Sequence, residues 1–305
     1  ILEVKTLSQP VIIEVAMNGG MPKTANPSVP HTPDEVAAEG IRCIKAGACI
    51  VHNHTRDPVM GGTGNHDPKP YQEAWSKIRE QYPDAIFYPT MPGGAPGQTI
   101  EQRYSHIEQL ADEGLLGIGL VDSGTTDIGS YNKDGLPKPG DWVYQNTWAD
   151  GVYMVEACRR LKVGLSFSIF EPGFVRFLQG YADSGQLPPG AFIKFYFGGP
   201  RSGFGLQPTE KALDAYLEMI EKFDLPWLVS VQGGDVIASG IAQLALERGG
   251  HLQVGLEPSG DRTRDNVQLV TEAVELARRM GREPATSVQA RKILNLPPQI
   301  RPSTD

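Results

Sequence analysis

The sequence has no apolar run that approaches the roughly 20 residues needed to cross a bilayer. Its first ten residues, ILEVKTLSQP, also lack the basic start and the apolar core of a secretory signal peptide. These two absences predict a soluble, cytoplasmic protein that does not act in a membrane.

Positive charge and cysteine are also scarce. The 28 Lys and Arg residues are outnumbered by 36 Asp and Glu residues, which gives a formal net charge of -8 and argues against nucleic acid as a partner. The three cysteines, Cys43, Cys49 and Cys158, are an odd number within apolar stretches. They predict buried free thiols rather than a disulfide framework.

Short β-rich runs alternate with longer runs of helical spacing, as in βα units around a parallel sheet. The expected strands are 11–16, 48–53, 86–89, 116–121, 164–170, 192–197, 227–231 and 253–256. The expected helices are 32–46, 69–81, 99–113, 149–161, 174–184, 209–223, 235–247 and 261–280. This α/β pattern of eight strands, each followed by a helix, predicts a (β/α)8 TIM barrel. We expect a single domain over 1–305 with a proline-rich tail at about 295–305.

The predicted helix starts and turns agree with this fold. Thr32 and Thr209 precede acidic residues, where a hydroxyl can cap a helix and a carboxylate favours the helix dipole. Glycine and proline collect after the strands, as in 91–94, 197–200 and 232–235. Functional groups of such barrels lie at the carboxyl ends of the strands, so we expect the chemistry there.

The strongest local motif is an HxH pair at the end of an apolar strand. Side chains alternate along a strand, so His52 and His54 point to the same side and can bind one metal ion. A histidine pair satisfied by ordinary hydrogen bonds is the alternative. A catalytic zinc takes three protein ligands, often with one carboxylate, and Glu257 at the end of the eighth strand qualifies as the third.

Several further polar residues are expected near the same end of the barrel. Glu14 lies within the first strand and should point inward, where a carboxylate is paired, adjacent to the metal or a proton carrier. A structural Glu paired with an arginine is the alternative. Glu171, after the fifth strand, makes a weaker case for the same role. Asp122 and Ser123, after the fourth strand, could bind substrate or cap a loop.

Arg56, next to the HxH pair, could clamp a carboxylate through two hydrogen bonds, or it could pair with Asp57. We expect the first of these roles. The remaining histidines have no partner at ligand spacing and are expected to be surface or structural residues: His31, His66, His106 and His251. Neither a GxxxxGK[ST] nor a GxGxxG motif is present, so a nucleotide site is only weakly indicated by the diglycines.

The segments 26–37 and 46–58 resemble the β-keto acid cleavage enzymes, and the likeness extends to the strand of Glu14 and to VGLE at 254–257. This resemblance implies a (β/α)8 barrel, usually tetrameric, with zinc on His52, His54 and Glu257. It also implies that a β-keto acid and acetyl-CoA are converted to acetoacetate and a new acyl-CoA. Zinc would polarise the keto acid, and the family's active-site Glu on the first strand maps to Glu14.

The sequence departs from the family at the eighth strand. The family pattern there reads Arg-Val-Gly-Leu-Glu-Asp, with the Asp as general base, whereas this chain has Gln253 and Pro258 at the Arg and Asp positions. Gln carries no charge and Pro takes no proton, so the usual base and a cation are missing. Either Glu14, Asp122 or Glu171 takes over as base, or the reaction differs.

Three hypotheses follow for the function. The first is the zinc-dependent exchange between a β-keto acid and acetyl-CoA, with Thr90, Ser123 and Gln253 at the substrate. The second is a CoA-independent, metal-dependent C–C lyase, aldolase or hydrolase of a small carboxylate. The third is a non-catalytic small-molecule binder. Two histidines and a carboxylate also suit other divalent metals, and the resemblance implies a homo-oligomer, a dimer or a tetramer.

Overall fold

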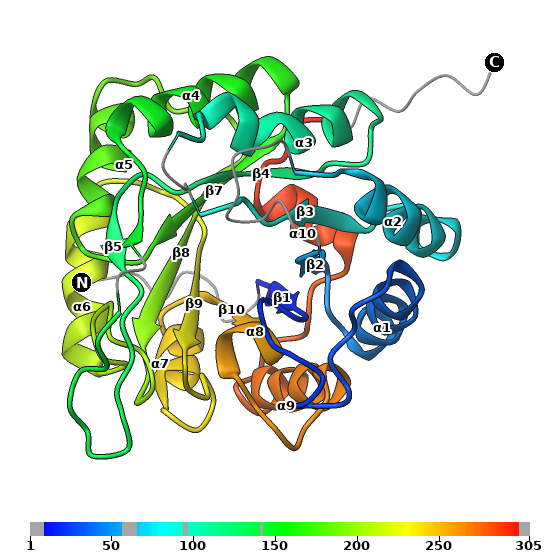
Figure 1. The fold of residues 1–305 in the computed structure, drawn as a ribbon. Helices are drawn as coiled ribbons and strands as arrows, with labels where there is room; N and C mark the ends of the chain where they lie inside the picture. Colours follow the sequence, from blue (N-terminus) through cyan, green and yellow to red (C-terminus); the bar gives the residue numbers. More distant parts are fainter. Residues whose placement is uncertain (1–8, 57–65, 94–96, 141–142, 299–305) are drawn as a thin grey trace.

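Parallel strands form a barrel at the centre of the computed structural model, which describes residues 9–56, 66–93, 97–140 and 143–298. The strands run in the order β3-β2-β1-β10-β9-β8-β7-β4. The backbone N–H of Gly117, just before β4, donates to the carbonyl of Phe87 on β3 at 3.0 Å and joins the two end strands. The helices surround the strands (Figure 1), so the (β/α)8 prediction is confirmed.

The expected elements recur with small shifts at their ends. The strands are β1 (Ile13–Ala16), β2 (Ile50–Asn53), β3 (Ile86–Pro89), β4 (Ile118–Val121), β5 (Thr126–Asp127), β6 (Val143–Tyr144), β7 (Gly164–Ile169), β8 (Ala191–Gly198), β9 (Trp227–Gln232) and β10 (His251–Val254). The helices are α1 (Pro33–Ala46), α2 (Lys69–Gln81), α3 (Ile100–Asp112), α4 (Trp148–Leu161), α5 (Phe174–Asp183), α6 (Glu210–Ile220), α7 (Ile241–Glu247), α8 (Leu256–Ser259), α9 (Asn266–Arg279) and α10 (Ser287–Ile293).

The barrel strands are buried on both faces, because helices cover the outside and side chains fill the inside. Every residue of β1, β2, β3, β4, β7, β8 and β10 is buried. Most of these residues are apolar, but a few polar side chains are enclosed as well. The polar residues within the strands therefore need partners inside the barrel.

The predicted helix caps are confirmed. Thr32 accepts the N–H of Glu35 and the Glu35 side chain returns to the Thr32 backbone, which completes a capping box at the start of α1. Thr209 accepts the N–H of Ala212 at the start of α6. Gly47 ends α1 with φ at 123°, a backbone conformation that residues other than glycine rarely adopt.

Two helices begin later than their sequence pattern predicts. The carboxylate of Asp261 accepts the backbone N–H groups two and three residues ahead, at 2.7 and 2.9 Å, and this turn delays α9 until Asn266. In the same way, the Asp235 carboxylate accepts the backbone N–H groups of Ile237 and Ala238 at 2.8 and 2.9 Å. Gly240 then adopts φ 83°, and α7 starts at Ile241.

Three short elements were not expected from the sequence: the β5–β6 hairpin, α8 and α10. The strand β10 ends at Val254 rather than at residue 256, so Glu257 stands on the short helix α8 and not directly at the strand end. The proline-rich tail is described only as far as residue 298, and a single domain over 1–305 stays a prediction. Across the described ranges, no helix is both long and apolar enough to span a membrane.

Candidate metal centre

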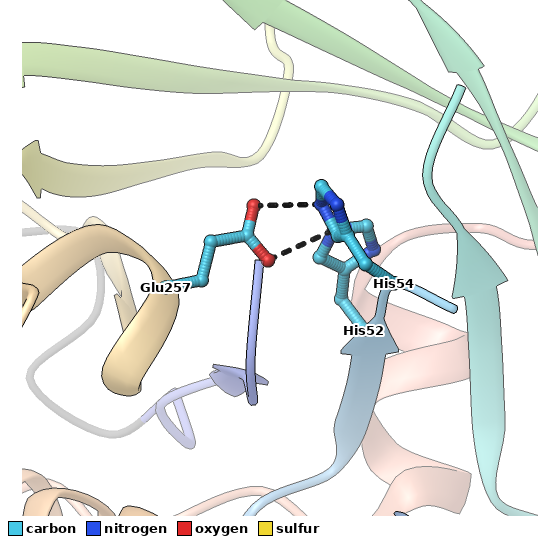
Figure 2. A group of neighbouring side chains, drawn as sticks. All are labelled: His52, His54 and Glu257. Carbon is cyan, nitrogen blue, oxygen red and sulfur yellow. Dashed lines mark hydrogen bonds and ion pairs between the residues drawn. The ribbon is translucent and has the colours of Figure 1, made fainter. Parts of the chain in front are cut away.

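Three side chains meet at the carboxyl end of the barrel. His52 lies in β2 and His54 comes directly after that strand, while Glu257 comes from α8, shortly after β10. His52 Nε2 lies 3.3 Å from Glu257 Oε2, and His54 Nε2 lies 3.2 Å from Glu257 Oε1. Figure 2 shows both imidazoles pointing at the same carboxylate. The ligand atoms of the three residues all lie within 4.8 Å of one another, close enough to hold one metal ion.

The ring of His52 has a fixed tautomer. Its Nδ1 lies 3.1 Å from the backbone carbonyl of Tyr88, and a carbonyl only accepts, so Nδ1 carries the proton. The Nε2 of the neutral ring then directs a lone pair at a carboxylate oxygen of Glu257. These two electron-rich atoms repel each other unless a cation lies between them or the ring takes a second proton. This donor set therefore fits a divalent metal.

The backbone places His54 and Glu257 accurately. Asn18, after β1, hydrogen-bonds to both the N–H and the C=O of His54. A Cβ built on Gly19 would lie 2.7 Å from Glu257 Cγ, so glycine leaves the room that the Glu257 side chain needs. Asn266 accepts the N–H of Leu256 at 2.9 Å and ties the start of α8 to α9.

Glu257 is a carboxylate rather than a carboxylic acid in this setting. Burial by itself would raise its pKa, but electrostatic interactions and hydrogen bonds with the imidazoles of His54 and His52 hold the pKa well below its usual range. Two imidazole nitrogens and one carboxylate leave coordination positions open, as in catalytic zinc sites. The same set also suits other divalent ions.

A second group of polar side chains fills the inside of the barrel next to the metal centre. This interior cluster consists of Glu14, Tyr88, Lys194, Tyr196 and Gln253. Glu14 Oε1 accepts hydrogen bonds from the Tyr88 hydroxyl and from Gln253 Nε2, the latter at 2.5 Å, and lies 3.4 Å from Lys194 Nζ. Glu14 is therefore paired, as expected, but with a lysine that the sequence reasoning did not identify.

Burial and the negative charge of Glu14 raise the pKa of Tyr88 well above its usual value, so Tyr88 remains a phenol that can donate. Burial alone would lower the pKa of Lys194, but Glu14 and other acidic neighbours more than offset this and raise it. The ring of Tyr88 also stacks on His52, with centroids 4.3 Å apart. The interior cluster and the metal centre thus share Tyr88.

Asp122 and Ser123 lie at the end of β4, on the wall of the barrel. Asp122 Oδ2 accepts the Tyr144 hydroxyl at 2.5 Å. Burial raises the pKa of Asp122, and the neighbouring hydroxyls of Tyr144 and Ser168 offset this only in part. Within the described ranges, Asp122 Oδ1 and the Ser123 hydroxyl have no hydrogen-bond partner. Thr90, after β3, is buried as well, and its carbonyl lies 2.7 Å from His106 Nε2.

Two of the expected site residues have contacts outside this group. The exposed Arg56 donates through Nη2 to the carbonyl of Met21 at 2.5 Å and also contacts the ring of His31; Asp57, its alternative partner, lies outside the described residues. Glu171 Oε1 accepts the Thr126 hydroxyl and the N–H of Gly205, both at 3.1 Å. These bonds tie Glu171 to β5 and to the loop of Gly205.

The remaining histidines and the cysteines have the structural contacts that the sequence predicts. His251 Nδ1 accepts the N–H of Ile12 at 3.1 Å, and burial lowers the pKa of His251 to about 3. His66 and His106 are buried with ring centroids 4.5 Å apart, and His31 contacts the Met21 carbonyl. The three cysteines are buried and free.

Comparison with known proteins adds to this geometry. The family model of the beta-keto acid cleavage enzyme matches residues 10–296. The 3-keto-5-aminohexanoate cleavage enzyme of Fusobacterium nucleatum is 29% identical over 95% of this chain and 99% of the relative. The 3,5-dioxohexanoate:acetyl-CoA acetone transferase of Paraburkholderia graminis is 25% identical over 94% of this chain and 96% of the relative.

Among solved structures, the apo form of ObcA is similar, with a TM-score of 0.66 at 16% identity over 89% of this chain and 66% of that chain. At this identity the likeness supports the barrel fold alone. The family model, in contrast, spans nearly the whole chain, and the curated relatives match it along their full length. The chain belongs to the beta-keto acid cleavage enzyme family.

Proposed function

We propose that this protein is a zinc-dependent enzyme that exchanges acyl groups between a β-keto acid and acetyl-CoA. The products would be acetoacetate and a new acyl-CoA, so that one C–C bond breaks and another forms. The observation that carries this proposal is the convergence of His52, His54 and Glu257, with the Nε2 of His52 aimed at Glu257. Acetyl-CoA as the second substrate is supported by the name of the Paraburkholderia relative.

Zinc on these three residues would supply a Lewis acid that polarises the keto acid and stabilises the negative charge that develops on its oxygen. The chain itself prepares the ligands for this role. Tyr88 fixes the tautomer of His52, and Asn18 fixes the backbone of His54. Polar partners of this kind orient metal ligands and raise their affinity.

We assign the proton-accepting role to Asp122, since Pro258 occupies the position of the usual base. Asp122 lies at the carboxyl end of β4, is buried, and has a raised pKa, as a general base at neutral pH requires. Tyr144 holds one of its oxygens, and the other has no partner within the described part of the chain. Glu171 suits this role less well, because its bonds to Thr126 on β5 and to Gly205 engage its Oε1.

We propose that three side chains face the substrate: Thr90, Ser123 and Gln253. We also propose that Arg56 binds a carboxylate outside the metal centre. Ser123 supports this best, because its hydroxyl is buried and free of hydrogen bonds among the described residues. The family resemblance further supports a homotetramer. The mass of the protein in solution would test the assembly.

A CoA-independent lyase of a small carboxylate is the second candidate. It is favoured by one specific observation: the residue after the proposed metal ligand Glu257 is Pro258, which is buried and accepts the N–H of Gly233 through its backbone carbonyl. This position therefore offers no group for proton transfer. A CoA-independent reaction would turn over a keto acid without any thioester.

The test is mass-spectrometric detection of acetoacetate and new acyl-CoA when the zinc-loaded protein meets acetyl-CoA and a panel of β-keto acids. We expect both products from the wild type and neither from His52→Ala, which should also lose its zinc. His251→Asn, at a histidine outside the metal centre that bonds only to the N–H of Ile12 among the described residues, serves as the control. Turnover of a keto acid without acetyl-CoA would instead support the lyase, and a His52→Ala protein that keeps its zinc would refute the ligand assignment.

A further inference from the structure

Lys194 lies in the middle of β8 and is only 1% exposed. A buried ammonium group is stable only when it is paired and hydrogen-bonded. Lys194 Nζ lies 3.4 Å from Glu14 Oε1, donates to the Tyr88 hydroxyl at 2.5 Å and lies 4.3 Å from the centre of the Tyr88 ring. These contacts hold a full positive charge inside the barrel.

The positive charge of Lys194 balances the negative charge of Glu14. Its Oε1 also accepts from Gln253, but an amide brings no net charge. Within the described ranges, Lys194 is the one cation in contact with Glu14. The sequence led us to expect that the cation of this site was lost with the replacement of the family's arginine by Gln253. The structure instead provides a cation from β8, beside that same glutamine.

Tyr88 connects this ion pair to the metal centre. Its backbone carbonyl holds Nδ1 of His52 and its ring stacks on the His52 ring at an interplanar angle of 20°. Its hydroxyl bonds to both Glu14 and Lys194. The residue that orients a metal ligand is therefore itself held in place by the ion pair.

Resting on the function proposed above, we propose that Lys194 is the positioning residue that balances Glu14 and lets the metal centre accept an anionic keto acid. The barrel holds three carboxylates near the metal centre and the interior cluster: Glu14 in β1, Asp122 directly after β4 and Glu257 on α8. Without Lys194, the carboxylate of a keto acid would meet the unbalanced charge of Glu14 in an environment where charges interact strongly. Lys194 acts through Glu14 and Tyr88 and needs no contact with the substrate.

The test measures binding of zinc, and then of acetoacetate to the zinc-loaded protein, by calorimetry at pH 8. In Lys194→Met we expect zinc affinity within about threefold of the wild type. The Tyr88 carbonyl that holds His52 belongs to the backbone of β3, and loss of a positive charge does not weaken the binding of a cation. Acetoacetate should bind at least about tenfold more weakly. Lys211→Met, at an exposed lysine of α6, is the matched control and should change neither affinity.

The double variant Glu14→Gln/Lys194→Met separates charge from structure. It removes both charges, so acetoacetate affinity should return to within about threefold of the wild type, and it remains informative if Lys194→Met alone does not fold. Either of two results would overturn the role of Lys194 and leave the proposed function intact. One is wild-type acetoacetate affinity in Lys194→Met. The other is a double variant that binds acetoacetate at least about tenfold more weakly than the wild type. A wild-type protein that binds zinc but no acetoacetate would overturn the proposed function as well.

Discussion

Asn18 holds both backbone polar groups of His54. Its Oδ1 accepts the N–H of His54 at 2.7 Å, and its Nδ2 donates to the carbonyl of His54 at 3.0 Å and to that of Pro30 at 2.9 Å. Asn18 is buried, so these bonds are shielded from water. The direction in which the imidazole of His54 leaves the chain is therefore set by a residue at the end of another strand.

Asn18→Ala should weaken zinc binding by about 10- to 100-fold, the usual effect of removing a group that orients a metal ligand. A competition titration against a chelating dye measures this loss. Asn26→Ala is the matched control, because Asn26 is also buried and makes three bonds to backbone groups, at 2.8, 2.9 and 3.0 Å. Equal losses of zinc affinity in the two variants would contradict a specific role for Asn18.

Gly19→Ala should also impair the metal centre, but by displacing the carboxylate. Gly19 has φ 49°, and its added Cβ would lie 2.7 Å from Glu257 Cγ, closer than the two carbons can approach. Zinc affinity should fall by at least about tenfold, in the range seen for disturbed ligand orientation. The strained backbone should cost roughly 1–2 kcal/mol of unfolding free energy.

Gly185→Ala controls for the backbone strain. Gly185 has a similar φ of 67°, but no atom lies within 4 Å of its added Cβ. Both variants should therefore lose stability in urea unfolding, and only Gly19→Ala should lose zinc affinity. Normal zinc binding in Gly19→Ala would show that Glu257 is not a ligand or that its side chain adapts without cost.

The sequence predicts the histidine pair of the metal centre because the geometry of an HxH motif on a strand is local. Alternation along a strand places His52 and His54 on one side, and the structure brings both to Glu257. The structural context of Glu257 could not be predicted, since α8 is a single turn of helix over Leu256–Ser259 and has no periodic pattern. A glutamate just after a barrel strand can lie at the strand end or in the turn that follows. The sequence pattern is the same in both cases.

The interior partners were missed for a different reason. Lys194 carries a signal that could have identified it: a lone lysine in the apolar run AFIKFYF needs a buried partner, by the reasoning used for Glu14. Asn18 carries no such signal, because its bonds go to backbone groups that any sequence possesses. The β5–β6 hairpin was also missed, since its strands have two residues each.

Asp122→Asn should lower kcat for the exchange reaction by about 10²- to 10⁴-fold, the usual contribution of a general base. The amide keeps an oxygen for the Tyr144 hydroxyl, so zinc content and folding should remain normal. Glu171→Gln, which also replaces a carboxylate by an amide, should stay within about threefold of wild-type kcat, because it affects loop contacts instead. A larger loss of kcat in Glu171→Gln than in Asp122→Asn would transfer the proton-accepting role to Glu171.

His251 should make the protein less stable in mild acid. Its Nδ1 accepts a backbone N–H inside the protein, and burial, with a smaller effect of Arg282, lowers its pKa from 6.5 to about 3. At a pH between these two values, the unfolded chain binds a proton on His251 and the folded chain does not. This contribution to stability is complete above pH 6.5 and is lost as the pH falls toward 3. Between pH 7 and pH 5 the loss is about 2 kcal/mol.

Replacement by asparagine isolates this contribution. His251→Asn keeps an acceptor for the N–H of Ile12 but removes the titrating ring. Urea unfolding at several pH values should show a loss of stability between pH 7 and pH 5 that is about 2 kcal/mol smaller than in the wild type. Between pH 7 and pH 8 the two profiles should run parallel, because the ring is neutral in both folded and unfolded chains. Parallel profiles down to pH 5 would mean that the folded protein accepts a proton on His251.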